Sequence, residues 1–207
     1  MLRAPEKAAD CTLAAVQFPN VSFLLSVATV GQFPPDIGRE VAFAGRSNAG
    51  KSSAINAILN RNGLARTSKT PGRTKLLNYF EVEHARRIVD LPGYGYAVAS
   101  PVERAQWTAV IDTLPARESM TGLFLIVDVR RGLRQEDHQL IEWARAAGWQ
   151  VHVLLAKSDK LNQRERAQAL KDAERQLPDG VSAQVFSAHD GIGIEAAQKA
   201  LIGMLSH

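Results

Sequence analysis

The chain has 207 residues and a mass of 22.5 kDa, enough for one α/β domain with its own core. Hydrophobic residues make up 45% and charged residues 22%, which excludes a wholly disordered chain, a collagen-like repeat and a coiled-coil rod. The single cysteine, Cys11, excludes an intramolecular disulfide, and the net charge of +4 mildly favours a polyanionic partner. The most apolar early stretch, residues 21–30, is too short to span a bilayer, so we expect a cytoplasmic protein with no membrane partner.

Apolar runs alternate with amphipathic helical patterns from residue 41 onward, which is typical of βαβ proteins with a largely parallel sheet. Residues 1–20 are expected to form a flexible tail before a single domain over residues 21–207. Within that domain, residues 21–40 fit either an edge strand or an irregular lead-in. The predicted strands are residues 41–44, 76–82, 86–89, 122–127, 151–155 and 183–186. The predicted helices are residues 51–59, 100–114, 136–147, a helix capped by Asn162 that stops before Pro178, and residues 194–205.

Residues 45–52 read GRSNAGKS, a complete G-x-x-x-x-G-K-S motif. Backbone N–H groups of such a turn can point at phosphate oxygens, and the helix that follows adds its positive N-terminal end. We expect Lys51 to reach the β- and γ-phosphates and the Ser52 hydroxyl to bind Mg²⁺. A chance match in a surface turn is disfavoured, because the motif lies between an apolar strand and an amphipathic helix. The predicted phosphate-binding residues are Gly45, Arg46, Ser47, Asn48, Ala49, Gly50, Lys51 and Ser52.

A D-x-x-G motif, Asp90-Leu91-Pro92-Gly93, follows the apolar pair at residues 88–89. An aspartate at the end of a strand can hold the Mg²⁺ shell, usually through water, as Walker B aspartates do. Gly93 leaves its N–H free to approach a γ-phosphate. The motif alone also fits an ordinary β-turn, but downstream of a phosphate-binding loop it indicates a nucleotide switch.

Two segments that each follow a later predicted strand contain residues that can recognise the base of a nucleotide. The Asp159 carboxylate, in Lys157-Ser158-Asp159, can accept hydrogen bonds from the N1 and N2 donors of guanine, a pair that adenine lacks. The aliphatic stem of Lys157 can lie along the base plane. Ser187-Ala188 offers a backbone N–H for guanine O6. Each fragment alone is a common strand exit, and their order after successive strands favours guanine recognition.

In order, the segments GRSNAGKS, TPGRT, DLPG, KSD and FSA resemble the five nucleotide-binding motifs of translation-factor-related GTPases. Residues 41–58, 65–82 and 88–97 resemble the EngB-type ribosome-biogenesis GTP-binding proteins of bacteria, a likeness that extends loosely over residues 22–205. It implies an α/β P-loop GTPase domain of three layers, with a mostly parallel six-stranded sheet flanked by helices. It also implies GTP or GDP with Mg²⁺, binding to the rRNA and proteins of a large ribosomal subunit precursor, and a link to cell division and septation. We expect a monomer without a DNA partner.

By position in this resemblance, Thr74 matches the switch threonine that serves Mg²⁺ and the γ-phosphate, and Thr70 fits less well. Ala156 departs from the family, which usually has threonine or asparagine there. Alanine removes a hydrogen bond that would brace the P-loop or the base loop. Such a bond is typically worth about 1 kcal/mol. The resemblance extends the predicted nucleotide contacts to Gly72, Arg73, Lys75, Leu76, Leu91, Pro92, Ala156, Lys157, Ser158, Phe186, Ser187 and Ala188.

Tyr94 occupies the position of the glutamine that orients the attacking water in Ras-like enzymes. No arginine finger can be assigned from the sequence, so we expect slow hydrolysis supported by Lys51, Thr74 and Gly93. Asn48 resembles the asparagine that helps potassium-activated GTPases hold K⁺ against the phosphates. An equally weighted alternative is that Asn48 tightens the loop through a local side-chain hydrogen bond.

The interval from residue 61 to 75 holds five basic and no acidic residues, and it fits either a solvated basic loop or a switch loop that touches ribosomal RNA phosphate. Arg130, Arg131 and Arg134 form a second basic group. The histidines lack zinc spacing, the tryptophans are expected in the core, and Glu136-Asp137 are expected as helix first-turn acids. Two alternative functions are a septation scaffold with little hydrolysis and, less favoured, a P-loop small-molecule kinase.

Overall fold

The computed structural model describes residues 18–65, 76–94 and 108–206. A sheet of seven strands runs through it in the order β1-β3-β4-β2-β5-β6-β7. Its strands are β1 (Ser22–Val27), β2 (Arg39–Gly45), β3 (Leu77–Glu83), β4 (Arg86–Asp90), β5 (Met120–Asp128), β6 (Gln150–Ala156) and β7 (Ser182–Val185). The run from β4 through β2, β5 and β6 to β7 is parallel, and β1 and β3 are antiparallel additions at one edge.

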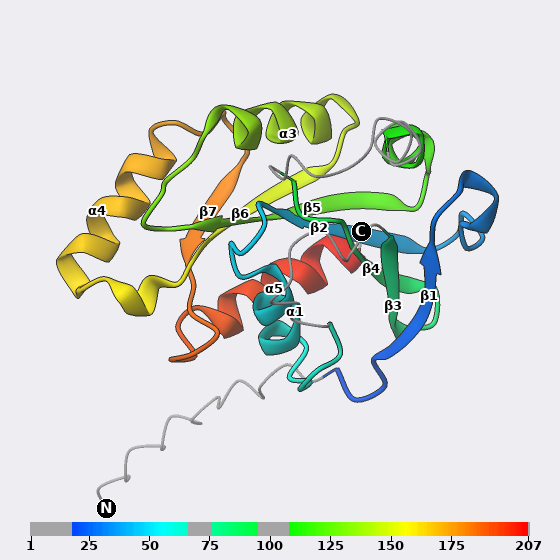
Figure 1. Cartoon of the computed structure of the whole chain (residues 1–207), viewed down its shortest axis with the longest axis horizontal. Helices are drawn as coiled ribbons and strands as arrows, with labels where there is room; N and C mark the ends of the chain where they lie inside the picture. The colour runs from blue at the N-terminus through cyan, green and yellow to red at the C-terminus, as the bar shows by residue number, and fades with distance from the viewer. Residues whose placement is uncertain (1–17, 66–75, 95–107, 207) are drawn as a thin grey trace, which may run out of the picture.

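Helices cover both faces of the sheet, which gives three layers (Figure 1). They are α1 (Lys51–Ile58), α3 (Gln135–Ala146), α4 (Gln163–Glu174) and α5 (Ile194–Ser206). Helices α1 and α5 cover one face, whereas α3, α4 and a helical segment at residues 108–113 lie on the other. Short 3-10 turns are η1 (Val30–Gln32), η2 (Leu114–Ala116) and η3 (Ser158–Lys160). No helix within the described ranges is both long and apolar enough to cross a bilayer.

The expected fold class is confirmed, but the sheet has one strand more than the six expected. The additional strand is β1. Residues 21–40, for which the sequence allowed an edge strand or an irregular lead-in, therefore contain an edge strand. Its last residue, Val27, is fully buried, and Phe23 packs edge-on against Phe80 of β3 although it remains 55% exposed. This weak, half-exposed pattern explains why the sequence alone left the segment undecided. Of the expected helix over residues 100–114, only residues 108–113 are described as helical, and residues 100–107 lie outside the described part.

The carboxyl ends of the central parallel strands meet at one edge of the sheet. Phe43 of β2 pairs with Asp90 at the end of β4, and Asp128 at the end of β5 pairs with Ala156 at the end of β6. In open α/β sheets ligands bind in the crevice outside these strand ends. The strand register therefore brings the D-x-x-G motif and the base-recognition segment to the same edge as the phosphate-binding loop.

A buried ionic cluster lies at the other end of these strands, where β2 and β4 begin. Glu40, which is fully buried at the start of β2, accepts hydrogen bonds from Arg87 at 2.7 Å and from Arg117 at 2.8 and 3.0 Å. The two guanidinium groups also donate to the backbone carbonyls of Pro34, Pro35 and Ile37. This cluster fastens the β1–β2 connection to the amino ends of the strands, away from the strand ends that carry the sequence motifs.

Candidate nucleotide-binding site

The phosphate-binding loop runs from the end of β2 to the start of α1, as the sequence predicts. A β-carbon on Gly45 would lie 2.7 Å from the carbonyl oxygen of Ile126, so only glycine fits there. Gly50 has φ of 110° and Asn48 has φ of 64°, both in the left-handed region. Glycine enters that region without strain, and asparagine tolerates it better than most residues. The loop backbone can make this turn because residues 45 and 50 are glycine and residue 48 is asparagine.

Lys51 and Asp90 form an ion pair at the mouth of this loop. Their side chains are only 10% and 5% exposed. Burial raises the pKa of the Asp90 carboxyl, and the Lys51 ammonium beside it opposes the rise. The pair places a cation where the motif requires a phosphate ligand and a carboxylate where it requires a metal-shell ligand.

The half-buried Ser52 hydroxyl, in the first turn of α1, and the Asp90 carboxylate supply oxygen donors of the kind that Mg²⁺ prefers. The residues present therefore fit a magnesium ion between the loop and β4. Thr74, the third predicted magnesium ligand, lies outside the described residues together with Gly72, Arg73 and Lys75. Leu76 is described and lies just before β3, with its side chain 38% exposed.

The D-x-x-G segment lies against the phosphate-binding loop. Tyr94 N–H donates to the Gly45 carbonyl, and Ser47 N–H donates to the Tyr94 carbonyl at 3.1 Å. A β-carbon on Gly93 would lie 3.0 Å from the Ser47 hydroxyl oxygen and 3.3 Å from the Ser47 backbone, so a larger residue would have to push Ser47 aside. The Tyr94 hydroxyl donates to the buried Asp137 of α3. Tyr94 is thus tied to α3 by its side chain and to the P-loop by its backbone.

The two segments predicted to recognise the base are joined to each other. The Asp159 carboxylate accepts a hydrogen bond from the Ser187 hydroxyl at 2.8 Å and pairs with Lys160 at 3.0 Å. The hydrogen bond from Lys160 lowers the pKa of Asp159, so this carboxylate is ionised at neutral pH and available to accept. Ser158 N–H donates to the Phe186 carbonyl, which locks the loop after β6 to the exit of β7.

The fold distinguishes the two backbone N–H groups of the Ser187-Ala188 pair. Ser187 N–H donates to the Ile192 carbonyl at 2.9 Å, so this backbone donor is already engaged. Among the described residues none accepts from the Ala188 N–H, which leaves it as the donor of this pair for guanine O6. The sequence could not show that Ser187 contributes through its hydroxyl, because that role depends on the fold of residues 187–192.

Lys157 bridges the base loop and the phosphate-binding loop. Its backbone is left-handed, with φ of 62°, and its ammonium donates to the Asn48 carbonyl and, at 3.0 Å, to Asp128. The methyl group of Ala156 faces the same loop, 3.8 Å from where a β-carbon on Gly50 would lie. A longer polar side chain at position 156 would reach this loop, whereas the alanine provides no hydrogen bond.

Several predicted contact residues lie in the core, so their side chains do not face the site. The side chains of Leu91 and Phe186 are 3% and 1% exposed and belong to the apolar clusters on the two faces of the sheet. Pro92 and Ser158 are also buried. We expect these residues to shape the nucleotide site only through their backbone.

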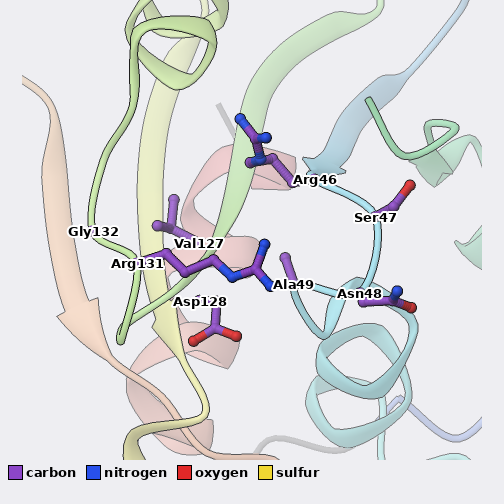
Figure 2. Close-up of a pocket in the computed structure, with 8 residues that line it drawn as sticks. All are labelled: Arg46, Ser47, Asn48, Ala49, Val127, Asp128, Arg131 and Gly132. Carbon is purple, nitrogen blue, oxygen red and sulfur yellow. The ribbon is translucent and has the colours of Figure 1, made fainter. Parts of the chain in front are cut away.

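A pocket lies beside the phosphate-binding loop, between it and the β5–α3 connection (Figure 2). Asp128 and Arg131 line one side, with the Arg131 side chain extending towards Ala49. Arg46 on the other side pairs with Glu136 of α3 at 3.0 Å. Asp128 was not predicted from the sequence as a residue of this pocket. Its signal was the one that identified Asp90, an acidic residue directly after a buried strand.

The remaining sequence assignments have mixed outcomes. Glu136 and Asp137 lie in the first turn of α3 as expected, and Trp143 packs edge-on against the buried Trp149. Arg61 donates to the carbonyls of Phe18 and Pro19, so the first cation of the basic interval is engaged within the fold. Arg66, Lys69 and Trp107 lie outside the described residues.

Comparison with known proteins identifies the family of this chain. Residues 40–157 match the family model described as 50S ribosome-binding GTPase. The probable GTP-binding protein EngB of Nitrosococcus oceani is 49% identical over 180 residues, which cover 85% of this chain and 90% of that protein. This chain belongs to the EngB family of GTP-binding proteins. The EngB protein of Dechloromonas aromatica is 45% identical, over 91% of this chain and 88% of its own length.

Solved structures agree with the EngB assignment at the level of the fold. A crystal structure of a probable GTP-binding protein engB matches with a TM-score of 0.63 and 23% identity, over 80% of this chain and 98% of that one. Era, in a complex with MgGDPNP and a segment of 16S ribosomal RNA, matches with a TM-score of 0.64 and 19% identity, over 82% of this chain and 57% of Era. As an EngB-family member the chain is a P-loop GTPase, which removes the small-molecule kinase from consideration.

Proposed function

We propose that this GTPase is a cytoplasmic, slowly hydrolysing switch that binds GTP and GDP with Mg²⁺ and associates with a large ribosomal subunit precursor in its GTP form. The observation that carries the nucleotide part is the meeting of three groups at one sheet edge. These are the P-loop with Lys51, the metal-shell carboxylate Asp90, and the base carboxylate Asp159 oriented by Ser187. Their separation in sequence requires the parallel sheet to bring them together.

Nucleotide binding would separate the Lys51–Asp90 ion pair. Lys51 would turn to the β- and γ-phosphates, and Asp90 and Ser52, with Thr74, would hold the magnesium shell. The bound magnesium supplies neutralisation of phosphate charge. Gly93, seated against Ser47, would then present its N–H to the γ-phosphate.

The ribosomal part of the proposal rests on family and charge. The matching family model is described by 50S ribosome binding, and the chain carries a net charge of +4. Arg131 and Arg134 are exposed in the β5–α3 connection, next to the P-loop, and suit contacts with RNA phosphate. In this proposal, the link of the family to cell division and septation is an indirect consequence of impaired ribosome assembly. The chain acts as a monomer.

Sedimentation with purified large subunits tests this part. We expect more protein to sediment with a non-hydrolysable GTP analogue than with GDP, and binding to fall steeply with salt. The double variant Arg131→Gln/Arg134→Gln should weaken binding, whereas Lys199→Gln, an exposed change on α5, should not. Binding that ignores the nucleotide, or is unchanged in the double variant, would overturn the ribosomal part.

We extend the proposal to potassium as an aid to hydrolysis, held by Asn48. Tyr94 cannot replace a water-orienting glutamine while its hydroxyl donates a hydrogen bond to Asp137. Within the described ranges the Asn48 side chain makes no hydrogen bond to another residue, which leaves its amide oxygen available to a cation. Hydrolysis should be faster in KCl than in NaCl at equal ionic strength, and Asn48→Ala should remove the difference. A parent enzyme indifferent to the cation would contradict this role.

A further inference from the structure

Asp128 is a buried carboxylate whose two oxygens are both occupied. It ends strand β5 with 6% exposure. From the solvent side, Arg130 donates its Nε at 2.9 Å, its Nη2 at 2.7 Å and its backbone N–H at 3.2 Å. From the site, Lys157 donates its Nζ at 3.0 Å. Burial acts to raise the pKa of Asp128, but the hydrogen bonds from Arg130 and Lys157 outweigh it and lower the pKa below its ordinary value.

The position of this carboxylate in the sheet matters for nucleotide binding. Asp128 pairs in register with Ala156, the residue whose methyl group faces the P-loop where a hydrogen-bonding side chain is missing. The Lys157 ammonium that Asp128 holds also donates to the carbonyl of Asn48. A continuous polar link therefore runs from β5 through the base loop to the P-loop.

We propose that Asp128 is a positioning residue for the guanine nucleotide: it holds the Lys157 ammonium on the Asn48 carbonyl and so fixes the base loop relative to the P-loop. The inference rests on the proposed guanine-nucleotide binding. Lysine is a flexible side chain with three rotatable donors, and it loses side-chain entropy when held in one place. A buried carboxylate fixed by the fork of Arg130 is a rigid acceptor that keeps the ammonium in that place before the nucleotide binds.

The diagnostic change is Asp128→Asn, which keeps the shape and one acceptor but removes the charge. We expect fluorescent GDP to dissociate about ten times faster and its affinity to fall by about the same factor, since the link acts through preorganisation of the site. In a Lys157→Met background the same substitution should have less than about a twofold further effect, because the group that it positions is gone.

Asp172→Asn is the matched control, because it makes the same change of charge at an exposed acid on α4. It should leave GDP affinity within about twofold of the parent. Urea unfolding without nucleotide, measured for every variant, separates a loss of folding from a loss of positioning. If Asp128→Asn does not fold, Asp128→Glu, which keeps the charge but displaces it, enters the same cycle.

The outcomes separate this inference from the proposed function. Additive effects of the Asp128 and Lys157 substitutions, or an equal loss in Asp172→Asn, would overturn the positioning role while leaving GDP binding by the parent intact. Failure of the parent to bind GDP would instead overturn the proposed function, and the positioning role with it.

Discussion

The ion pair between Lys51 and Asp90 predicts an unusual response to Asp90→Asn. Both charges are largely buried, so nucleotide binding must replace a contact that water does not screen. A hydrogen bond to a charged group contributes about 1.5–3 kcal/mol, which corresponds to about 10- to 150-fold in affinity. In the proposed nucleotide complex, Mg²⁺ would compensate the Asp90 charge when Lys51 turns to the phosphates, and without Mg²⁺ Asp90 would lose the cation that it pairs with in this structure.

We therefore expect Asp90→Asn to bind GDP about 10-fold more tightly than the parent in the presence of EDTA, at the low end of that range. Adding Mg²⁺ should tighten GDP binding to the parent by about 10-fold or more and should barely affect the variant. Titration with fluorescent GDP, with and without Mg²⁺, measures all four affinities. Glu136→Gln, which breaks the exposed Arg46 pair, is the control. An equal loss of affinity in Asp90→Asn under both conditions would refute the reasoning.

Two further predictions concern stability. Glu40→Ala leaves the buried Arg87 and Arg117 unpaired and should lower the free energy of unfolding by about 3–5 kcal/mol in urea titration. The exposed Glu83→Ala should change it little, and a loss below about 1 kcal/mol for Glu40→Ala would contradict the role of the cluster. Burial lowers the pKa of His152, so stability should be complete above the unfolded pKa of about 6.5 and fall as pH drops below it, by at most about 1.4 kcal/mol per unit. His152→Gln should flatten this slope and the exposed His84→Gln should not; equal slopes in all three proteins would contradict the assignment.

The parts of the site that depend on local spacing could be predicted from the sequence. The P-loop was predicted correctly because its glycines, its lysine and the following helix are contiguous in the chain. Asp90 and Asp159 were identifiable because each directly follows a buried strand, and the ends of parallel strands share one edge of the sheet.

The parts that depend on long-range packing could not be predicted. Asp128 has no motif of its own, and its role requires knowing that its strand lies beside Ala156. Ser187 acts through its hydroxyl because Ile192 folds back to take its N–H. Strand β1 was undecided because its apolar pattern is weak and its burial comes from pairing with β3, which is distant in the sequence.

Nucleotide selectivity is the most direct test of the central claim, that Asp159 makes this a guanine-specific site. Fluorescent GDP and ADP should be titrated against the parent, Asp159→Ala and the control Asp172→Ala, an exposed acid on α4. We predict that the parent and the control prefer GDP by about 1–3 kcal/mol or more, and that Asp159→Ala loses the preference because the guanine donors are left unpaired. Equal affinity of the parent for the two nucleotides would contradict the claim.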